Sequence, residues 1–170
     1  MDHFHYKIPG WFTFPKLYSQ MVNTYQDAHF VEVGTWQGSS AAYMAVEIIN
    51  SGKNIKFDCV DTWKGSIEHT DYDVITEEKL YDVFLSNIEP VKHVINPIKM
   101  TSIDASKLYE DNSLDFVFID GLSTYDQTYK DFENYYKKLK NGGVMIGHNY
   151  SKIHDVYRAV QDYANIINKE

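Results

Sequence analysis

Three carboxylates stand within or directly after short apolar runs in this chain. Glu32 lies inside the first such run, and Asp61 and Asp120 each follow directly on a later one. His148 follows another. A carboxylate at a strand end can accept hydrogen bonds from hydroxyl groups, hold an amine or bind a metal, and an imidazole exchanges a proton near neutral pH. These residue types predict a binding site for a small polar ligand.

The segment 31–40, Val-Glu-Val-Gly-Thr-Trp-Gln-Gly-Ser-Ser, is typical of a turn between a strand and a helix. Gly34 and Gly38 let the backbone turn tightly and approach a ligand, and the helix that follows offers free N–H groups. The Glu32 carboxylate disfavours a pyrophosphate there and favours a cation, such as an amino group or a sulfonium. Trp36 replaces the middle glycine of a G-x-G-x-x-G motif, which argues against an NAD-dependent dehydrogenase. Glycines also occur at such turns for steric reasons alone.

Asp61 is the candidate for binding a ribose. It ends the second apolar run, and an acidic residue at this strand end accepts both ribose hydroxyls in nucleotide-binding folds. It follows Glu32 by 61 − 32 = 29 residues, about the length of one βαβ step. The alternative is a surface aspartate that caps a turn. The adjacent Trp63 could stack on a ring or belong to the core.

Asp120 and His148 are the candidates for catalysis. Asp120 ends the most apolar run and could hold a substrate amine, a metal or part of a cofactor. His148 would lie near it if their strands are neighbours. The imidazole could be a general base, a metal ligand or a structural histidine, and the sequence leaves these three alternatives open.

Strand and helix patterns alternate along the chain, which predicts the elements that position these residues. The expected strands are 29–33, 55–60, 94–100, 114–119 and 143–146, and the expected helices are 16–24, 39–50, 76–87, 125–139 and 155–167. This alternation predicts an α/β, doubly wound (Rossmann-like), mostly parallel sheet with helices on both faces. Pro97 places the third strand at an edge. The tyrosines of the helix 125–139 are expected to pack in the core.

We expect a single domain, in which residues 1–28 form an N-terminal arm and helix and residues 29–170 bind the cofactor. The fifth strand would be an edge of the sheet, because no further strand pattern follows it. Bare edges tend to pair, so we expect either a homodimer or an arm folded over that edge. The apolar side chains of Trp11, Phe12 and Phe14 also favour this, and a monomer with a fully solvated Trp11 would argue against it.

Composition narrows the partners. The net charge of −8 argues against nucleic acid or an anionic membrane as a partner, because both need basic patches. No apolar run approaches the roughly 18 residues that span a bilayer, and no secretory signal is visible. The lone Cys59 suits a reducing compartment, so the expected location is the cytoplasm.

Taken together, these segments resemble the class I S-adenosylmethionine-dependent methyltransferases, and among them the small branch that includes sugar and macrolide O-methyltransferases. The resemblance covers about residues 30–164. It rests on five segments in order, namely FVEVGTWQGSS at 30–40, VDTWKGS at 60–66, SIDAS at 102–106, LDFVFIDG at 114–121 and GGVMIGHNY at 142–150. Each alone is weak, but their order and spacing are jointly specific.

The resemblance implies S-adenosylmethionine as the cofactor. Its methionine part would lie at Glu32 and the glycines, its ribose at Asp61 and its adenine between 62–63 and 102–105, with the N-terminal helix as a lid. The expected cofactor-binding residues are Glu32, Gly34, Thr35, Trp36, Gly38, Ser39, Asp61, Thr62, Trp63, Ser102, Ala105 and Asp120.

The chain departs from this family at two positions near the expected catalytic residues. Ser123 stands where the branch has a histidine, and Asn149 follows His148 where an aspartate is usual. Asp120, His148 and Asn149 would supply a single carboxylate to a divalent cation, so we expect no tight metal site. The family also continues into two further strands that this sequence lacks.

The predicted function is therefore transfer of the methyl group of S-adenosylmethionine to a small-molecule acceptor, with O-methylation favoured. His148 would take the proton of the acceptor, and Asp120 would position the acceptor or the amino group of the cofactor. The alternative is a non-catalytic module that binds S-adenosylmethionine, since the residues at 123 and 149 are replaced.

Overall fold

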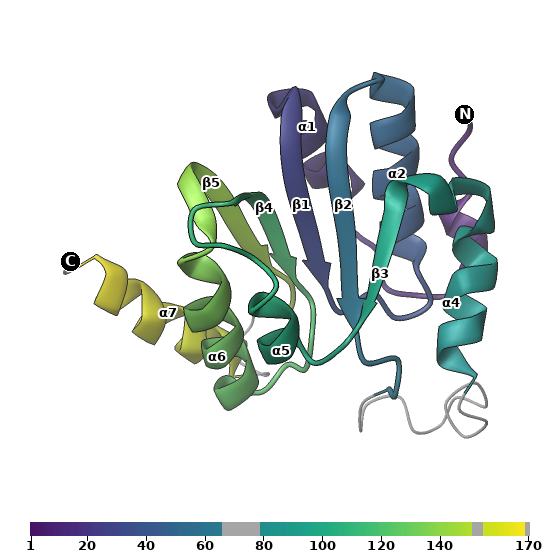
Figure 1. The fold of residues 1–170 in the computed structure, drawn as a ribbon. Helices are drawn as coiled ribbons and strands as arrows, with labels where there is room; N and C mark the ends of the chain where they lie inside the picture. The colour runs from purple at the N-terminus through teal and green to yellow at the C-terminus, as the bar shows by residue number, and fades with distance from the viewer. Residues whose placement is uncertain (66–78, 151–154, 169–170) are drawn as a thin grey trace.

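A sheet of parallel strands forms the centre of the computed structural model, which describes residues 1–65, 79–150 and 155–168 (Figure 1). The strands of this sheet are β1 (Asp27–Val33), β2 (Asn54–Asp61), β3 (Ile95–Lys99), β4 (Leu114–Ile119) and β5 (Leu139–Gly147). Their order is β3-β2-β1-β4-β5, and every neighbouring pair is parallel. The predicted doubly wound α/β fold is confirmed, and β3 lies at an edge as Pro97 indicated.

Helices cover both faces of the sheet (Figure 1). They are η1 (His5–Lys7), α1 (Pro15–Thr24), α2 (Ser39–Ser51), α4 (Leu80–Ile88), η3 (Glu89–Val94), α5 (Ser102–Ser106), α6 (Tyr125–Tyr136) and α7 (Val156–Ile167). One core cluster lies between the sheet and α1, α2 and α4, and a second lies between the sheet and α5 and α6. Phe30 belongs to the first cluster and its neighbour Val31 to the second, because successive side chains of a strand point to opposite faces.

The predicted helix after β4 is too long at its carboxyl end. We expected it to reach Leu139, but α6 ends at Tyr136 and Leu139 begins β5 by pairing with Leu114. The register then shifts between Leu114 and Phe116, and Gly142 and Gly143 lie inside this irregular strand. Pairing with β4 therefore overrides the helical spacing of Leu139.

The aromatic stripe of α6 packs against α7. The rings of Tyr129, Phe132 and Tyr136 contact Tyr163. A different face of α6, with Thr128, Asp131 and Tyr135, is buried toward the sheet. The expected start of the helix 76–87, at Thr76, lies outside the described residues.

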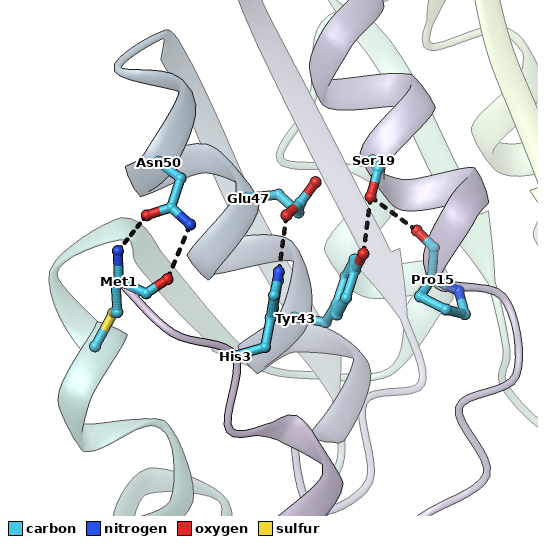
Figure 2. Close-up of polar contacts among 7 residues, drawn as sticks. All are labelled: Met1, His3, Pro15, Ser19, Tyr43, Glu47 and Asn50. Carbon is cyan, nitrogen blue, oxygen red and sulfur yellow. Dashed lines mark hydrogen bonds and ion pairs between the residues drawn. The ribbon is translucent and has the colours of Figure 1, made fainter.

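The N-terminal arm packs on α2, as Figure 2 shows. The His3 ring stacks on Tyr43 and its Nε2 lies 2.9 Å from Glu47 Oε1. Behind the arm, Ser19 of α1 hydrogen-bonds Tyr43 at 2.8 Å. Phe14, at the end of the arm, packs on Phe118 and His148. The described contacts therefore place the arm on α2 and near the carboxyl ends of β4 and β5, and not along the edge of the fifth strand as we expected. Trp11 is also not buried, since 56% of its surface is exposed.

Candidate functional site

A cavity of about 790 Å³ opens at the carboxyl ends of the strands. Its walls come from the arm (residues 9–13), the turn after β1, the end of β2, the start of α5, the turn after β4 and the end of β5. It lies beside the pair β1 and β4, where the strand order reverses. Ligands of doubly wound folds bind at this place, and the volume is in the usual range for small-molecule pockets.

Gly34 brings the ends of β1 and β4 close together. Its φ is +87°, and a Cβ there would lie 2.1 Å from the backbone oxygen of Asp120. No other residue type fits, because the left-handed φ and the contact both exclude a side chain. The turn after β1 thereby passes directly over the end of β4.

Asp61 ties this turn to β2. Its Oδ2 accepts hydrogen bonds from the backbone N–H groups of Thr35 and Trp36 at 2.9 and 3.1 Å, and its Oδ1 accepts one from Trp63 at 2.8 Å. Each carboxylate oxygen can accept two hydrogen bonds, so Oδ1 retains capacity for a ligand hydroxyl.

Thr35 presents an unsatisfied polar atom in the cavity wall. Its Oγ1 is buried and has no hydrogen-bond partner within the described parts of the chain. A buried hydroxyl without a partner costs stability, so such an atom is usually completed by a ligand or water. The hydroxyl and the Asp61 carboxylate fit a ligand that carries both acceptor and donor groups.

Asp120 and His148 meet in the cavity wall, just after β4 and β5. His148 Nδ1 lies 3.0 Å from Asp120 Oδ1, and this hydrogen bond raises the pKa of the imidazole above its usual value. The ring of Phe14 packs near the imidazole, with centroids 5.2 Å apart. Beside them, Asn149 Nδ2 donates to Ser123 Oγ at 2.8 Å. A carboxylate that orients an imidazole is an arrangement suited to general base catalysis.

Most of the predicted site residues line this cavity. They are Gly34, Thr35, Trp36, Ser39, Asp61, Thr62, Ser102, Asp120, His148 and Asn149. The turns after β1, β2, β4 and β5 bring them together, because the carboxyl ends of parallel strands meet at one edge of a sheet.

Glu32 does not line the cavity. Only 1% of its surface is exposed, and its oxygens accept hydrogen bonds from Tyr18 at 2.8 Å and Ser40 at 2.6 Å. Burial raises its pKa to about 8. Glu32 shares the sheet face of Phe30, two residues earlier, so its side chain enters the core under α1 and α2. In this structure Glu32 is linked to the cavity wall through Ser40, which lines the cavity.

Three other predicted residues also lie behind the wall. Trp63 is 3% exposed and packs on Tyr81 and Phe84, so it belongs to the core. Gly38 precedes α2 with φ +93° and faces the side chains of Phe84 and Ile88. Ala105 is buried in the second core cluster.

The cavity residues that were not predicted from the sequence include Gln127 and Asp131 of α6. Asp131 is 1% exposed, and its Oδ1 accepts hydrogen bonds from Ser102 Oγ and from Gln127 Nε2. Burial raises its pKa to about 6. A signal existed, since Asp131 lies at helical spacing with Thr128 and Tyr135, away from the stripe that contacts α7.

Within residues 1–65, 79–150 and 155–168, no group of three or more His, Cys, Asp or Glu side chains is arranged to hold a metal ion. The helices of these same residues include none that is long and apolar enough to cross a membrane.

Comparison with known proteins agrees with this geometry. The sequence model of the family described as "Methyltransferase domain" matches residues 31–150. An uncharacterized protein, y4gI, of Sinorhizobium fredii is 26% identical over 128 residues, which are 75% of this chain and 14% of that protein. This chain thus spans about one seventh of the length of that relative.

Solved structures share the fold. The O-methyltransferase NovP superposes with a TM-score of 0.69 at 17% identity, covering 91% of this chain and 72% of NovP. An O-methyltransferase from Bacillus cereus in complex with SAH gives a TM-score of 0.63 at 17% identity, covering 97% of this chain and 74% of that one. At such identities the likeness is one of fold.

Proposed function

The chain belongs to the methyltransferase domain family, and from this we propose that it transfers the methyl group of S-adenosylmethionine to a hydroxyl group of a small molecule. The observation that carries the proposal is the position of the Asp120–His148 pair. It lies in the same cavity as the Gly34 turn and Asp61, so that a reactive group and a cofactor site share one space.

The residues that would hold the cofactor lie along the turns after β1 and β2. Asp61 would accept a hydrogen bond from a ribose hydroxyl through Oδ1, and the Thr35 hydroxyl would form its missing hydrogen bond with the ligand. Residues 34–36 and Ser39 would surround the methionine part. Glu32 would act only through Ser40. When bound, S-adenosylmethionine supplies an electrophilic methyl group on a sulfonium.

His148 would serve as the general base. Asp120 accepts a hydrogen bond from Nδ1–H, which fixes the tautomer in which Nε2 carries a free lone pair. Nε2 would take the proton of the acceptor hydroxyl, and the Asp120 carboxylate would stabilise the imidazolium that forms. The arm residues Trp11 and Phe12 line the same cavity and would exclude water from it.

A divalent cation has little support as a second cofactor. Asp120 gives a single carboxylate to the group with His148 and Asn149, and one of its oxygens is engaged by the imidazole. Hard cations such as Mg²⁺ need several oxygen ligands. We therefore propose base catalysis by His148 in place of activation by a metal.

Three further observations support a small-molecule acceptor, a location in the cytoplasm and a homodimer. The net charge of −8 favours a small-molecule acceptor over nucleic acid. The buried, unpaired Cys59 is compatible with the cytoplasm. A homodimer is supported by the position of β5 at the edge of the sheet.

The pH dependence of kcat/KM tests the role of His148, with methyl transfer measured on a panel of phenol, sugar and amine acceptors. His148 must be neutral to accept a proton, and its pKa is raised above 6.5. Activity should therefore decline as the pH is lowered through this raised pKa. Asp120→Asn removes the hydrogen-bonded carboxylate, so this limb should move to lower pH. His148→Gln should lower kcat by about 10²-fold or more.

The matched control is His93→Gln, which changes an exposed histidine of η3 and should leave the profile unchanged. An unaltered rate in His148→Gln would contradict base catalysis. Tight binding of S-adenosylhomocysteine without transfer to any acceptor would favour the alternative, a non-catalytic cofactor-binding module.

A further inference from the structure

Asp131 presents an unused acceptor to the cavity. Within the described residues its Oδ1 accepts two hydrogen bonds, from Ser102 and Gln127, whereas no hydrogen bond reaches Oδ2. Oδ2 faces the turn after β4, where a Cβ on Gly121 would lie 3.6 Å from it. A carboxylate oxygen of a cavity-lining residue that accepts no hydrogen bond from the protein is suited to accept one from a ligand.

The strand order indicates which part of the cofactor reaches this wall. In the proposed site the ribose lies at Asp61, after β2, and the methionine part lies at the turn after β1. The other neighbour of β2 in the sheet is β3. Met100, at the end of β3, donates its backbone N–H to the Asp61 backbone oxygen at 3.1 Å, so this segment borders the ribose position directly. The base of the nucleoside should therefore extend toward residues 100–103 and the adjoining face of α6.

This part of the cavity is lined by both apolar and polar residues. Met100, Ile103 and Leu122 are apolar, and Ser102, Gln127 and Asp131 supply polar groups that are hydrogen-bonded to one another. An apolar slot accepts the faces of a planar base, and a polar end reads the groups on its edge. Among the edge groups of adenine, the 6-amino group is the donor that an ionised carboxylate prefers.

We infer that Asp131 is a specificity-determining residue of the cofactor site, because its Oδ2 accepts a hydrogen bond from the 6-amino group of the purine. The inference rests on the proposed function and adds the residue that distinguishes a 6-aminopurine from a 6-oxopurine. A 6-oxo group would place a second acceptor against Oδ2. Burial raises the pKa of Asp131 to about 6, which is still below 8, so the carboxylate is ionised at pH 8.

Ser102 and Gln127 make Asp131→Asn an informative substitution. Gln127 Nε2 donates to Ser102 Oγ at 3.0 Å, which turns the Ser102 hydroxyl toward Asp131 Oδ1. Both residues thus donate to the same position. An asparagine would place its carbonyl oxygen there and its NH₂ group toward the cavity, which replaces the acceptor by a donor of the same size.

The experiment is calorimetric titration at pH 8 with S-adenosylhomocysteine and with S-inosylhomocysteine, its 6-oxo analogue. The wild-type protein should bind the adenosyl compound at least about tenfold more tightly, the usual loss when a charged buried acceptor is left unpaired. In Asp131→Asn this ratio should fall by about tenfold or reverse. Asp126→Asn, an exposed aspartate of the same helix, should keep the wild-type ratio.

Equal binding of both compounds by the wild-type protein would overturn the inference, and this comparison needs no variant to fold. An unchanged ratio in Asp131→Asn would overturn it as well. Binding of neither compound by the wild-type protein would instead refute the cofactor site as a whole, and with it the proposed function.

Discussion

Burial of Glu32 stabilises its protonated form. Its two oxygens accept hydrogen bonds from Tyr18 and Ser40, but burial is the larger influence and raises its pKa to about 8. The pKa of Tyr18 is also raised, mainly by its own burial. The pair joins α1 to β1 at the level of the cavity.

Protonation of Glu32 should make stability depend on pH. In the unfolded chain its pKa is near 4.5, so between about pH 4.5 and 8 the folded state holds a proton that the unfolded state has lost. The free energy of unfolding should therefore decrease as pH rises through this window, by at most about 1.4 kcal/mol per pH unit. In Glu32→Gln this contribution should be absent, as measured by urea unfolding at several pH values.

Glu133→Gln, which changes an exposed glutamate of α6, serves as the control and should retain the wild-type slope. Parallel curves for the wild type and Glu32→Gln would show that Glu32 is ionised in the folded state, against our prediction.

At the scale of elements, the first residues of the N-terminal arm pack on α2, whereas its later part, at Trp11, is largely exposed to solvent. His3 and His5 pack on Tyr43 of α2, and the Ser39 hydroxyl donates to the backbone oxygen of His5 at 3.0 Å. Further along, Trp11 contacts Trp36 through its ring while more than half of its surface remains exposed. This geometry suits a lid that tightens over an occupied cavity.

Hydrogen exchange tests the lid. Saturating S-adenosylhomocysteine should slow the exchange of amides 10–13 by about tenfold or more, because ordering these residues over the ligand removes open states. Amides of α7 lie away from the cavity wall and serve as the internal control. If amides 10–13 exchanged at the same rate with and without ligand, the arm would be a fixed part of the wall and not a lid.

At the scale of the whole molecule, the edges of the sheet differ. β3 is short and carries Pro97, which weakens it as a partner for another strand. β5 is longer and pairs with β4 alone among the described strands. The arm, which could have covered it, packs on α2. The β5 edge is thus the better candidate for contact between two copies of the chain.

We predict a homodimer that pairs along β5. Light scattering should give twice the mass of one chain at micromolar concentrations and approach a single mass on dilution. Amides of β5 should exchange faster in the dilute sample, because the pairing that protects them is lost. A single-chain mass at every concentration would contradict the dimer.

Local pattern in the sequence determined the order of the elements and the placement of three groups that line the cavity. Strand periodicity and turn residues located β1, β2 and β4, and these fixed Asp61 and Asp120 at their carboxyl ends. His148 followed in the same way from the end of β5. Such predictions hold because a parallel sheet gathers the ends of its strands at one edge, whatever the details of packing.

Only the tertiary structure decided which side chains face the cavity. Glu32 and Asp61 both lie at strand ends, yet one enters the core below α1 and the other ties the turn after β1. Asp131 came from a helix whose sequence showed a more conspicuous aromatic stripe, because the face of a helix that meets the sheet depends on its other partners. Leu139, which we expected in a helix, belongs to β5 because it pairs with Leu114. In each case the deciding free energy came from residues distant in sequence, which local periodicity does not contain.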